Sequence, residues 1–413
     1  MSTASRTLAA LLLPGLLHLA QADTPRKVLL PDTGGEIRSV AMSINSARRA
    51  ALRNAGTVSS LVNALPSSIA IDILVNDRAA FTVVDAEGGN RVNFVELPAD
   101  NPITIWPQDP FLVLRSDDPN QPATLLMSKS FERAGDASMA RYFAEQNGFD
   151  ILGSSLHFEG GNIVSDEKHI LIGANTIRFN ALERGVPDND IGLAFQDELG
   201  KPALVIGPFP QPVAHIDMMI TPLGNSRIAL ADARLGLKIA EAALADDPDS
   251  VRAFEDHCRE FFFGHPEITH IKQVNGDTIE PPDLEGMTRE LLAHNRDIAP
   301  VLDGIASALA SLGYEMLRIP FYFGGPELRP LNGSENEGSV ASYPMLTYNN
   351  VLLESRAGES RVYLPEYGWP AFDDAAQAAW RDAGFTPFPV QGLTTSAMYG
   401  GALRCTVKVL ERG

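Results

Sequence analysis

A single cysteine divides the stretch Tyr399-Gly400-Gly401-Ala402-Leu403-Arg404-Cys405-Thr406-Val407-Lys408-Val409-Leu410 into a loop of small residues and an alternating segment. The alternation over residues 406–410 predicts a β-strand, and the two glycines allow a sharp turn before it. The neighbouring cation of Arg404 favours a thiolate at Cys405. Taken alone, however, the stretch fits a buried, unreactive cysteine at least as well.

Three segments repeat one pattern, in which a predicted helix ends at a glycine followed by an aromatic residue and leads into a predicted strand. The three junctions are Gly148-Phe149, Gly313-Tyr314 and Gly384-Phe385. Glycine is the usual left-handed cap of a helix, and the aromatic residue can pack back on that helix. Polar loops with predicted strand pairs follow, at residues 158–162, 348–350 and 399–401. We interpret these segments as a repeated α-β-β unit whose loops meet at one place.

The first part of the chain indicates the same α/β class. Apolar spacing over residues 41–65 predicts a helix. Alternating runs predict strands at residues 69–75, 80–84, 92–97, 111–114 and 124–127. No Ser/Gly-rich linker or charge run divides the chain, so we expect one catalytic domain over residues 23–413.

The first 22 residues are typical of a secretory signal. Arg6 precedes an apolar run over residues 8–19, and the small residues Ala20 and Ala22 suit cleavage before Asp23. The run is too short for a stable anchor, and no other stretch is long and apolar enough to span a bilayer. We expect a soluble mature chain, secreted or periplasmic after cleavage near Ala22. A buried helix or an uncleaved anchor is the alternative.

The charge of the chain narrows the choice of partners. Its 413 residues carry a formal charge of -19, which argues against nucleic acid or an anionic membrane as the main partner. An acidic field suits a cationic substrate, although solubility alone explains it equally well. Of the two cysteines, Cys258 lies in a helical pattern and is predicted to be a small buried residue.

Three motifs with acidic residues accompany Cys405. The first is Trp106-Pro107-Gln108-Asp109-Pro110, whose prolines stiffen the backbone and fix the aspartate in a turn. The second is Phe158-Glu159-Gly160-Gly161-Asn162, whose glycine pair allows close approach of the backbone to a ligand. The third contains His215 and Asp217, which in a strand would project from the same face. Taken alone, the first motif fits an ordinary turn, the second fits an exposed bulge, and the third fits a surface pair or half of a metal site.

Together, two or three carboxylates, one histidine and one cysteine match the needs of nucleophilic attack on a guanidinium carbon. Carboxylates can hold the planar guanidinium cation from two directions. After a thiolate adds, a general acid must protonate the departing ammonia, and the same group can then activate water. We assign this double role to His215 and the nucleophilic role to Cys405.

The order of the motifs resembles that of the guanidino-group-modifying superfamily of arginine, agmatine and protein-arginine deiminases. The resemblance covers residues 106–410 and rests on Trp-x-Gln-Asp, Glu-Gly-Gly-Asn, His-x-Asp, Tyr-Asn-Asn and the terminal Gly-Gly-x-x-Arg-Cys. It implies the five-bladed, pseudo-symmetric α/β propeller of that superfamily.

The resemblance also implies a role for each motif residue. It makes Asp109 and Asp217 the clamp on the guanidinium group, Glu159 the residue that orients His215, and Cys405 the residue that forms a covalent thiouronium intermediate. Further predicted substrate contacts are Trp106, Gln108, Asn349, Asn350 and Arg404. The cation of Arg404 either points away from the pocket or binds an anion such as a substrate carboxylate.

The motif around Asp109 is most similar to protein-arginine deiminases, whereas Glu159-Gly160-Gly161 is more similar to the small-molecule enzymes. We therefore predict an exported cysteine hydrolase that converts arginine residues of peptides or proteins to citrulline. Deimination of free arginine or agmatine is the alternative, and a metallohydrolase or a non-catalytic binder of cationic ligands are rivals from other classes. Calcium-binding positions of animal protein-arginine deiminases correspond roughly to Leu112 and Val164, so we expect calcium independence, no metal and no cofactor.

Overall fold

The computed structural model describes residues 26–44, 48–76, 91–118, 121–260, 271–272, 278–279, 283–325, 327–328, 340–341 and 343–413. The predicted signal segment at residues 1–22 and the predicted strand at residues 80–84 lie outside these ranges. Among the helices that are described, none is long and apolar enough to cross a membrane.

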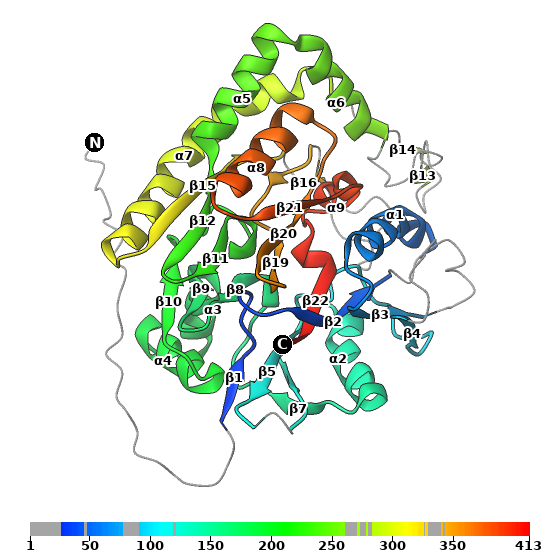
Figure 1. The fold of residues 1–413 in the computed structure, drawn as a ribbon, viewed down its shortest axis with the longest axis vertical. Coiled ribbons are helices and arrows are strands. Elements are labelled where there is room, and N and C mark those ends of the chain that lie inside the picture. Colours follow the sequence, from blue (N-terminus) through cyan, green and yellow to red (C-terminus); the bar gives the residue numbers. More distant parts are fainter. Residues whose placement is uncertain are drawn as a thin grey trace.

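Five sheets of three or four strands share one pattern within the described residues (Figure 1). In each sheet a first strand pairs antiparallel with a second, and one or more helices connect the second to a third strand that is parallel to it. The first unit consists of β5 (Phe111–Ser116), β6 (Thr124–Met127), α2 (Ala134–Asn147) and β7 (Asp150–Gly153), and the second of β8 (Ile163–Ser165), β9 (Ile170–Gly173), α3 (Ala174–Arg184), α4 (Asp188–Leu199) and β10 (Ala203–Ile206). The third consists of β11 (Ile220–Gly224), β12 (Arg227–Asp232), α5 (Ala233–Asp246), α6 (Pro248–Glu260), α7 (Met287–Ser311) and β15 (Glu315–Tyr322). The fourth consists of β19 (Leu352–Arg356), β20 (Glu359–Pro365), α8 (Pro370–Asp382) and β21 (Thr386–Val390), and the fifth of β22 (Val407–Arg412), β2 (Ile37–Ser43), α1 (Arg48–Ala64) and β3 (Ala70–Val75).

Four of the units are continuous in sequence, and the fifth joins the two ends of the described chain. Strand β22 pairs antiparallel with β2, in a register that runs from Ile37 opposite Arg412 to Met42 opposite Val407. The remaining strands extend these sheets or form small ribbons. They are β1 (Lys27–Leu29), β4 (Val92–Glu96), β13 (Ile271–Lys272), β14 (Thr278–Ile279), β16 (Glu327–Leu328), β17 (Val340–Ala341) and β18 (Leu346–Thr347). The short helix α9 (Leu393–Met398) lies between β21 and β22.

A turn or a single turn of 3₁₀ helix precedes the first strand of every unit. Asp109 lies just before β5, and Asn349 and Asn350 lie just before β19. The 3₁₀ turns η3 (Gly160–Asn162), η4 (Ile216–Met218) and η5 (Arg404–Thr406) lead into β8, β11 and β22. Hydrogen bonds join these turns to one another, as from Gly161 to Asp109 and from Cys405 to Asn350.

The α/β class predicted from the sequence is confirmed, with two differences in detail. The three glycine caps adopt the expected positive φ, from 72° at Gly148 to 88° at Gly384. The expected α-β-β repeat spans two of the observed β-β-α-β units, because its helix and first strand end one unit and its polar loop and strand pair begin the next. The predicted helix over residues 41–65 is wrong at its start, because residues 41–43 belong to β2. This end of β2 is buried on both faces, so it lacks the alternation that marks a half-exposed strand.

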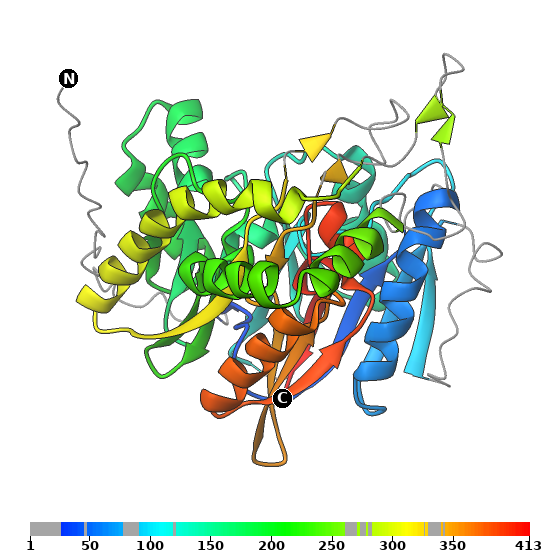
Figure 2. The ribbon, with the colours of Figure 1, turned by 90° about the horizontal axis from the view of Figure 1, so that it is seen from above.

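Helices α5, α6, α7 and α8 lie outside the sheets, as the yellow, green and orange ribbons of Figure 2 show. Aromatic side chains fill the space beneath them. The ring of Trp369 lies 4.8 Å from the rings of both Phe254 and Phe372, and all three side chains are buried. Burial of such large rings supplies much of the stability of a core of this kind.

Two helix glycines give a matched test of this packing. A Cβ atom at Gly236 of α5 would lie 1.9 Å from the carbonyl oxygen of Phe321 on β15, whereas a Cβ atom at Gly304 of α7 would meet nothing within 4 Å. We expect Gly236→Ala to lower the free energy of unfolding by roughly 1–3 kcal/mol, and Gly304→Ala to raise it by up to about 1 kcal/mol through helix propensity. Urea denaturation measures both changes, and equal effects of the two substitutions would contradict the close packing of α5 on β15.

Candidate active site

His215 lies between two carboxylates at the turn before β11. Its Nε2 atom is hydrogen-bonded to Oε2 of Glu159, and its Nδ1 atom lies 3.8 Å from Oδ1 of Asp109. His215 has extended backbone and is the N-terminal cap of η4, which contains Asp217. The prediction that His215 and Asp217 share one face of a strand is therefore wrong, because a 3₁₀ turn sets their spacing.

Gly161 makes the close approach of His215 and Asp109 possible. A Cβ atom at this position would lie 2.5 Å from Nδ1 of His215 and 3.2 Å from Oδ1 of Asp109. The backbone N–H of Gly161 donates to the same oxygen of Asp109 over 3.3 Å. Glycine is required here because the backbone itself contacts the two site residues.

Arg133 binds the other oxygen of Asp109 and is a site residue that the sequence analysis missed. Its Nη2 atom lies 3.0 Å from Oδ2 of Asp109, and its Nε atom donates to Asp136 over 2.7 Å. The guanidinium group also lies 4.8 Å from the centre of the Phe131 ring. No motif marks Arg133 in the sequence, since its partner Asp109 lies 24 positions away.

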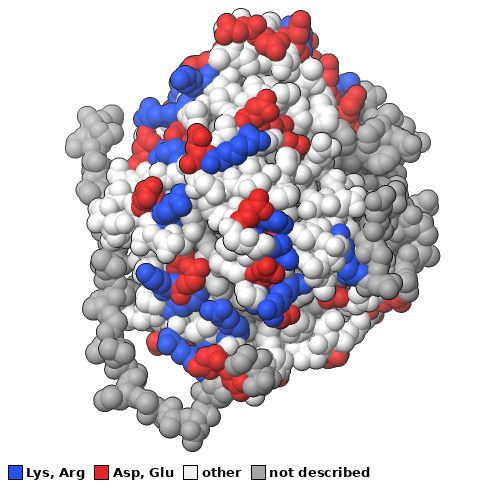
Figure 3. Space-filling model, in the orientation of Figure 1, with Lys and Arg blue, Asp and Glu red and all other residues white. Residues whose placement is uncertain are grey.

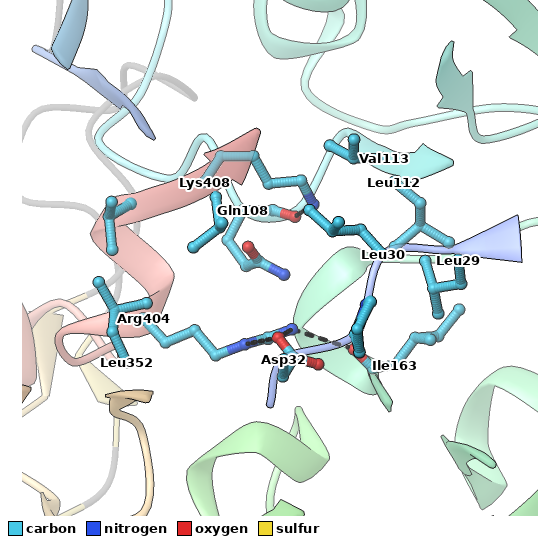
Figure 4. Close-up of a pocket in the computed structure, with 13 residues that line it drawn as sticks. Leu29, Leu30, Asp32, Gln108, Leu112, Val113, Ile163, Leu352, Arg404 and Lys408 are labelled. Carbon is cyan, nitrogen blue, oxygen red and sulfur yellow. Dashed lines mark hydrogen bonds and ion pairs between the residues drawn. The ribbon is translucent and has the colours of Figure 1, made fainter. Parts of the chain in front are cut away.

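Arg404 is buried, and its guanidinium group is bound by two carboxylates, of which Figure 4 shows Asp32. Its Nη1 atom donates to Oδ2 of Asp217 over 2.8 Å, and its Nε and Nη2 atoms donate to Oδ1 of Asp32 over 3.1 and 2.9 Å. Nη2 also donates to the carbonyl oxygen of Ile163 over 3.2 Å. Both carboxylates that hold this cation belong to the protein, and contact of Arg404 with a substrate stays a prediction.

The thiol of Cys405 lies in η5, directly before β22, and the residue is only 4% exposed. Its backbone N–H donates to Oδ1 of Asn350 over 3.1 Å. Its Sγ atom lies 3.9 Å from Sδ of Met218, the residue after Asp217. These two contacts place the predicted nucleophile against the turns that precede β19 and β11.

Several buried polar atoms around this thiol have no hydrogen-bond partner among the described residues. Neither the oxygen nor the nitrogen of the Asn349 side chain has one, and the Asn350 nitrogen and Oδ1 of Asp217 also lack one. Leaving such groups unpaired costs free energy, so native structures rarely do so outside sites that meet a ligand or water. Oδ1 of Asp217 is thus available for a ligand, while its Oδ2 atom is held by Arg404.

The other two residues of the first motif have structural contacts. The side-chain amide of Gln108 donates to the carbonyl oxygen of Gly160 over 3.2 Å, so it joins two turns of the site. The ring of Trp106 packs so closely on Gly401 that a Cβ atom there would lie 2.4 Å from it. Direct contact of either residue with a substrate stays a prediction.

The charges of the site shift the pKa values of its two proposed chemical groups. Burial alone would lower the pKa of His215, but the charge of Asp109 and the bond to Glu159 outweigh burial and raise the pKa to about 9. Burial, reinforced by the charges of Asp217 and Asp109, raises the pKa of the Cys405 thiol well above its usual range. These shifts favour an imidazolium at His215 and a neutral thiol at Cys405.

A cavity of ≈ 310 Å³ extends from His215 and Met218. Its wall is largely apolar and includes Phe323 and Met345. The amide of Gln211 is saturated by contacts with Asn162 and with backbone groups. Among the described lining residues only His215 and Tyr343 can ionise, so this part of the cavity suits an uncharged chain of methylene groups.

Metal-ligand clusters and surface charge do not indicate another site in the described part of the chain. The residues placed there form no cluster of three His, Cys, Asp or Glu side chains able to hold a metal ion. The face seen in Figure 3 mixes acidic and basic side chains, although the whole chain is strongly acidic. Calcium independence stays a prediction.

Comparison with solved structures identifies the fold. No protein-family model and no curated protein sequence matches the chain. An agmatine deiminase from C. jejuni superposes with a TM-score of 0.59 and 12% identity, over 94% of this chain and 96% of its own. The substrate-bound form of a C. jejuni variant gives a TM-score of 0.61 with 11% identity, over 96% and 99% of the two chains.

A third structure, named as a candidate peptidyl-arginine deiminase, superposes with a TM-score of 0.56 and 13% identity, over 94% of this chain and 99% of that one. The fold is thus that of the guanidino-modifying deiminases, as the resemblance implied. At these identities the similarity establishes the fold alone.

The raised pKa of His215 predicts a pH dependence of stability. Because the folded-state pKa of about 9 exceeds the ordinary value of 6.5, protonation stabilises the folded chain. This stabilisation is complete below the ordinary pKa and is lost as pH rises through the folded one. We expect wild type to lose roughly 2–4 kcal/mol more free energy of unfolding than His215→Gln between about pH 6 and about pH 10. Urea denaturation tests this, because urea carries no charge, and parallel pH profiles of the two proteins would contradict it.

Proposed function

We propose that this chain, which has the fold of the guanidino-modifying deiminases, is a cysteine hydrolase that deiminates a small guanidino compound and releases ammonia. One observation carries the proposal. Cys405 contacts Asn350 and Met218, His215 lies between Glu159 and Asp109, and Asp217, next to Met218, has an oxygen without a partner among the described residues. Guanidinium hydrolysis uses a nucleophile, a group that gives and takes protons, and carboxylates that hold the cation.

In the proposed first step, Sγ of Cys405 attacks the guanidinium carbon while Asp109 and Asp217 hold the guanidinium nitrogens. A C–S bond forms, a C–N bond breaks, and His215 supplies the proton with which ammonia leaves. In the second step His215 takes a proton from water, whose oxygen attacks the amidino carbon, and the C–S bond breaks to return the thiolate. The sum is a guanidinium ion plus water giving a ureido group plus ammonium.

The electrostatics of the site support this sequence of events. Burial, Asp217 and Asp109 hold the proton on Cys405 while the site is empty. A guanidinium cation beside the two aspartates would offset their charge, so that the thiol releases its proton to solvent as the substrate binds and the thiolate attacks. An imidazolium at His215 would then be in the correct form to protonate the leaving ammonia.

The substrate that we propose carries no carboxylate near its guanidinium group. Among the described residues, Arg133 and Arg404 are bound to carboxylates of the protein, and Lys408 donates to the carbonyl oxygen of Gln108. None of the three is available for the carboxylate of free arginine, and apart from His215, which Glu159 binds, the described wall of the cavity adds no cation. Agmatine is the simplest compound with the required chemistry, and an agmatine deiminase is among the solved structures of this fold.

Arginine within a peptide is the second candidate, because it too lacks a nearby free carboxylate. The motif from Trp106 to Asp109 resembles protein-arginine deiminases and supports this reading. Export after cleavage near Ala22, calcium independence and a closed five-bladed propeller remain parts of the proposal. The five units of similar strand order support the last of these.

The two cysteines provide a matched test of the chemistry. We expect Cys405→Ala to abolish formation of ureido product from agmatine, whereas Cys258→Ala, which changes the other free, buried cysteine on α6, keeps wild-type turnover. A colorimetric ureido assay measures both, with and without a chelator, and the chelator should leave wild-type turnover unchanged. Activity in Cys405→Ala would overturn the proposed nucleophile.

Substrate preference tests the absence of a carboxylate site. We expect kcat/KM for agmatine to exceed that for free arginine by roughly tenfold or more, because the arginine carboxylate would be desolvated without a partner. N-acetylarginine amide represents a residue within a peptide. Faster turnover of free arginine than of agmatine would contradict the proposal, and faster turnover of the amide than of agmatine would favour the peptide candidate.

A further inference from the structure

A second aspartate shares Arg404 with Asp217, and it lies outside the site. Asp32 follows β1, and its Oδ1 atom accepts from both Nε and Nη2 of Arg404. Its Oδ2 atom accepts the backbone N–H of Ser165 over 2.8 Å, which fixes the carboxylate against β8. Figure 4 shows the guanidinium group of Arg404 between Asp32 and the carbonyl oxygen of Ile163.

These contacts determine which atom of Arg404 reaches Asp217. With Nε and Nη2 bound to Asp32, only Nη1 remains for Asp217, and it binds a single oxygen, Oδ2. The other oxygen, Oδ1, stays buried and unpartnered. A guanidinium group released from Asp32 could bind both oxygens of Asp217, because paired N–H groups of arginine match a carboxylate in this way.

The charge of Asp32 matters as much as its geometry. Arg404 faces two carboxylates, so the cation does not by itself neutralise Asp217. Without the charge of Asp32, Arg404 and Asp217 would form a neutral buried pair, and a cationic substrate would lose much of its attraction to Asp217.

We infer that Asp32 is a positioning residue that acts through Arg404 to keep one oxygen and the charge of Asp217 available for the substrate guanidinium group. The inference rests on the proposed function and assigns to that site a residue that does not touch the substrate. Asp32 therefore controls substrate affinity through its ion pair with Arg404, without contact with the substrate.

The test is the substitution Asp32→Asn, which keeps the shape of the side chain and an acceptor for Ser165 but removes the charge. We expect KM for agmatine to rise roughly ten- to hundredfold, the range for loss of a charged hydrogen bond, while kcat changes much less. Binding of agmatine to Cys405→Ala, measured by calorimetry, should weaken by the same factor when Asp32→Asn is added.

The matched control is Asp303→Asn. Arg318 lies between Asp232 and Asp303 as Arg404 lies between Asp217 and Asp32, with distances of 3.0 and 2.9 Å, but on α7 and β15 outside the site. We expect this control to keep the wild-type KM, whatever it does to stability.

A double-mutant cycle separates positioning from folding. If Asp32 acts through Arg404, then Asp32→Asn has no further effect on KM in an Arg404→Gln background, because the residue that it restrains is gone. An unchanged KM in Asp32→Asn, or an equal additional rise in the Arg404→Gln background, would overturn the inference while the activity stands. A wild-type protein that turns over no guanidino compound would overturn the proposed function and this inference with it.

Discussion

The buried guanidinium group of Arg404 joins three parts of the chain that are remote in sequence. Asp32 lies 372 positions from it, Asp217 lies 187 positions from it, and the nucleophile candidate Cys405 is its neighbour. Burying the Arg404 cation without its carboxylate partners would be strongly destabilising. The segments that contain Asp32, Asp217 and Arg404 must therefore be in place together. The site is therefore formed only in the complete fold.

The site also shows how carboxylates can be shared between structure and chemistry. One oxygen of Asp109 accepts from Arg133, and one oxygen of Asp217 accepts from Arg404. The other oxygen of Asp109 faces His215, and the other oxygen of Asp217 has no partner among the described residues. This division keeps two negative charges fixed in a buried place while leaving them able to attract a planar cation.

The sequence predicted the parts of this site that local motifs carry. Cys405, His215, Glu159, Asp109 and Asp217 stood out because each lies beside glycines, prolines or another polar residue at a short spacing. Arg133 and Asp32 did not, since their function depends on partners that only the folded chain supplies. The end of β2 was predicted as helix because it is buried on both faces, so its residues do not alternate between apolar and polar as in a half-exposed strand. The spacing of His215 and Asp217 also fits a strand, because a single 3₁₀ turn has no sequence signature of its own.

The pairing of β2 with β22 has a consequence for how the chain reaches this state. Residues 37–43 must wait for residues 407–412 before their sheet is complete, and contacts so distant in sequence form slowly because of the entropy of closing the loop. Until then β2 exposes an unpaired edge that includes Val40, Ala41 and Met42, which are fully buried in the final structure. Such an edge is an aggregation hazard in a folding intermediate. A chain whose first sheet needs both of these distant segments is therefore expected to refold in better yield at low protein concentration.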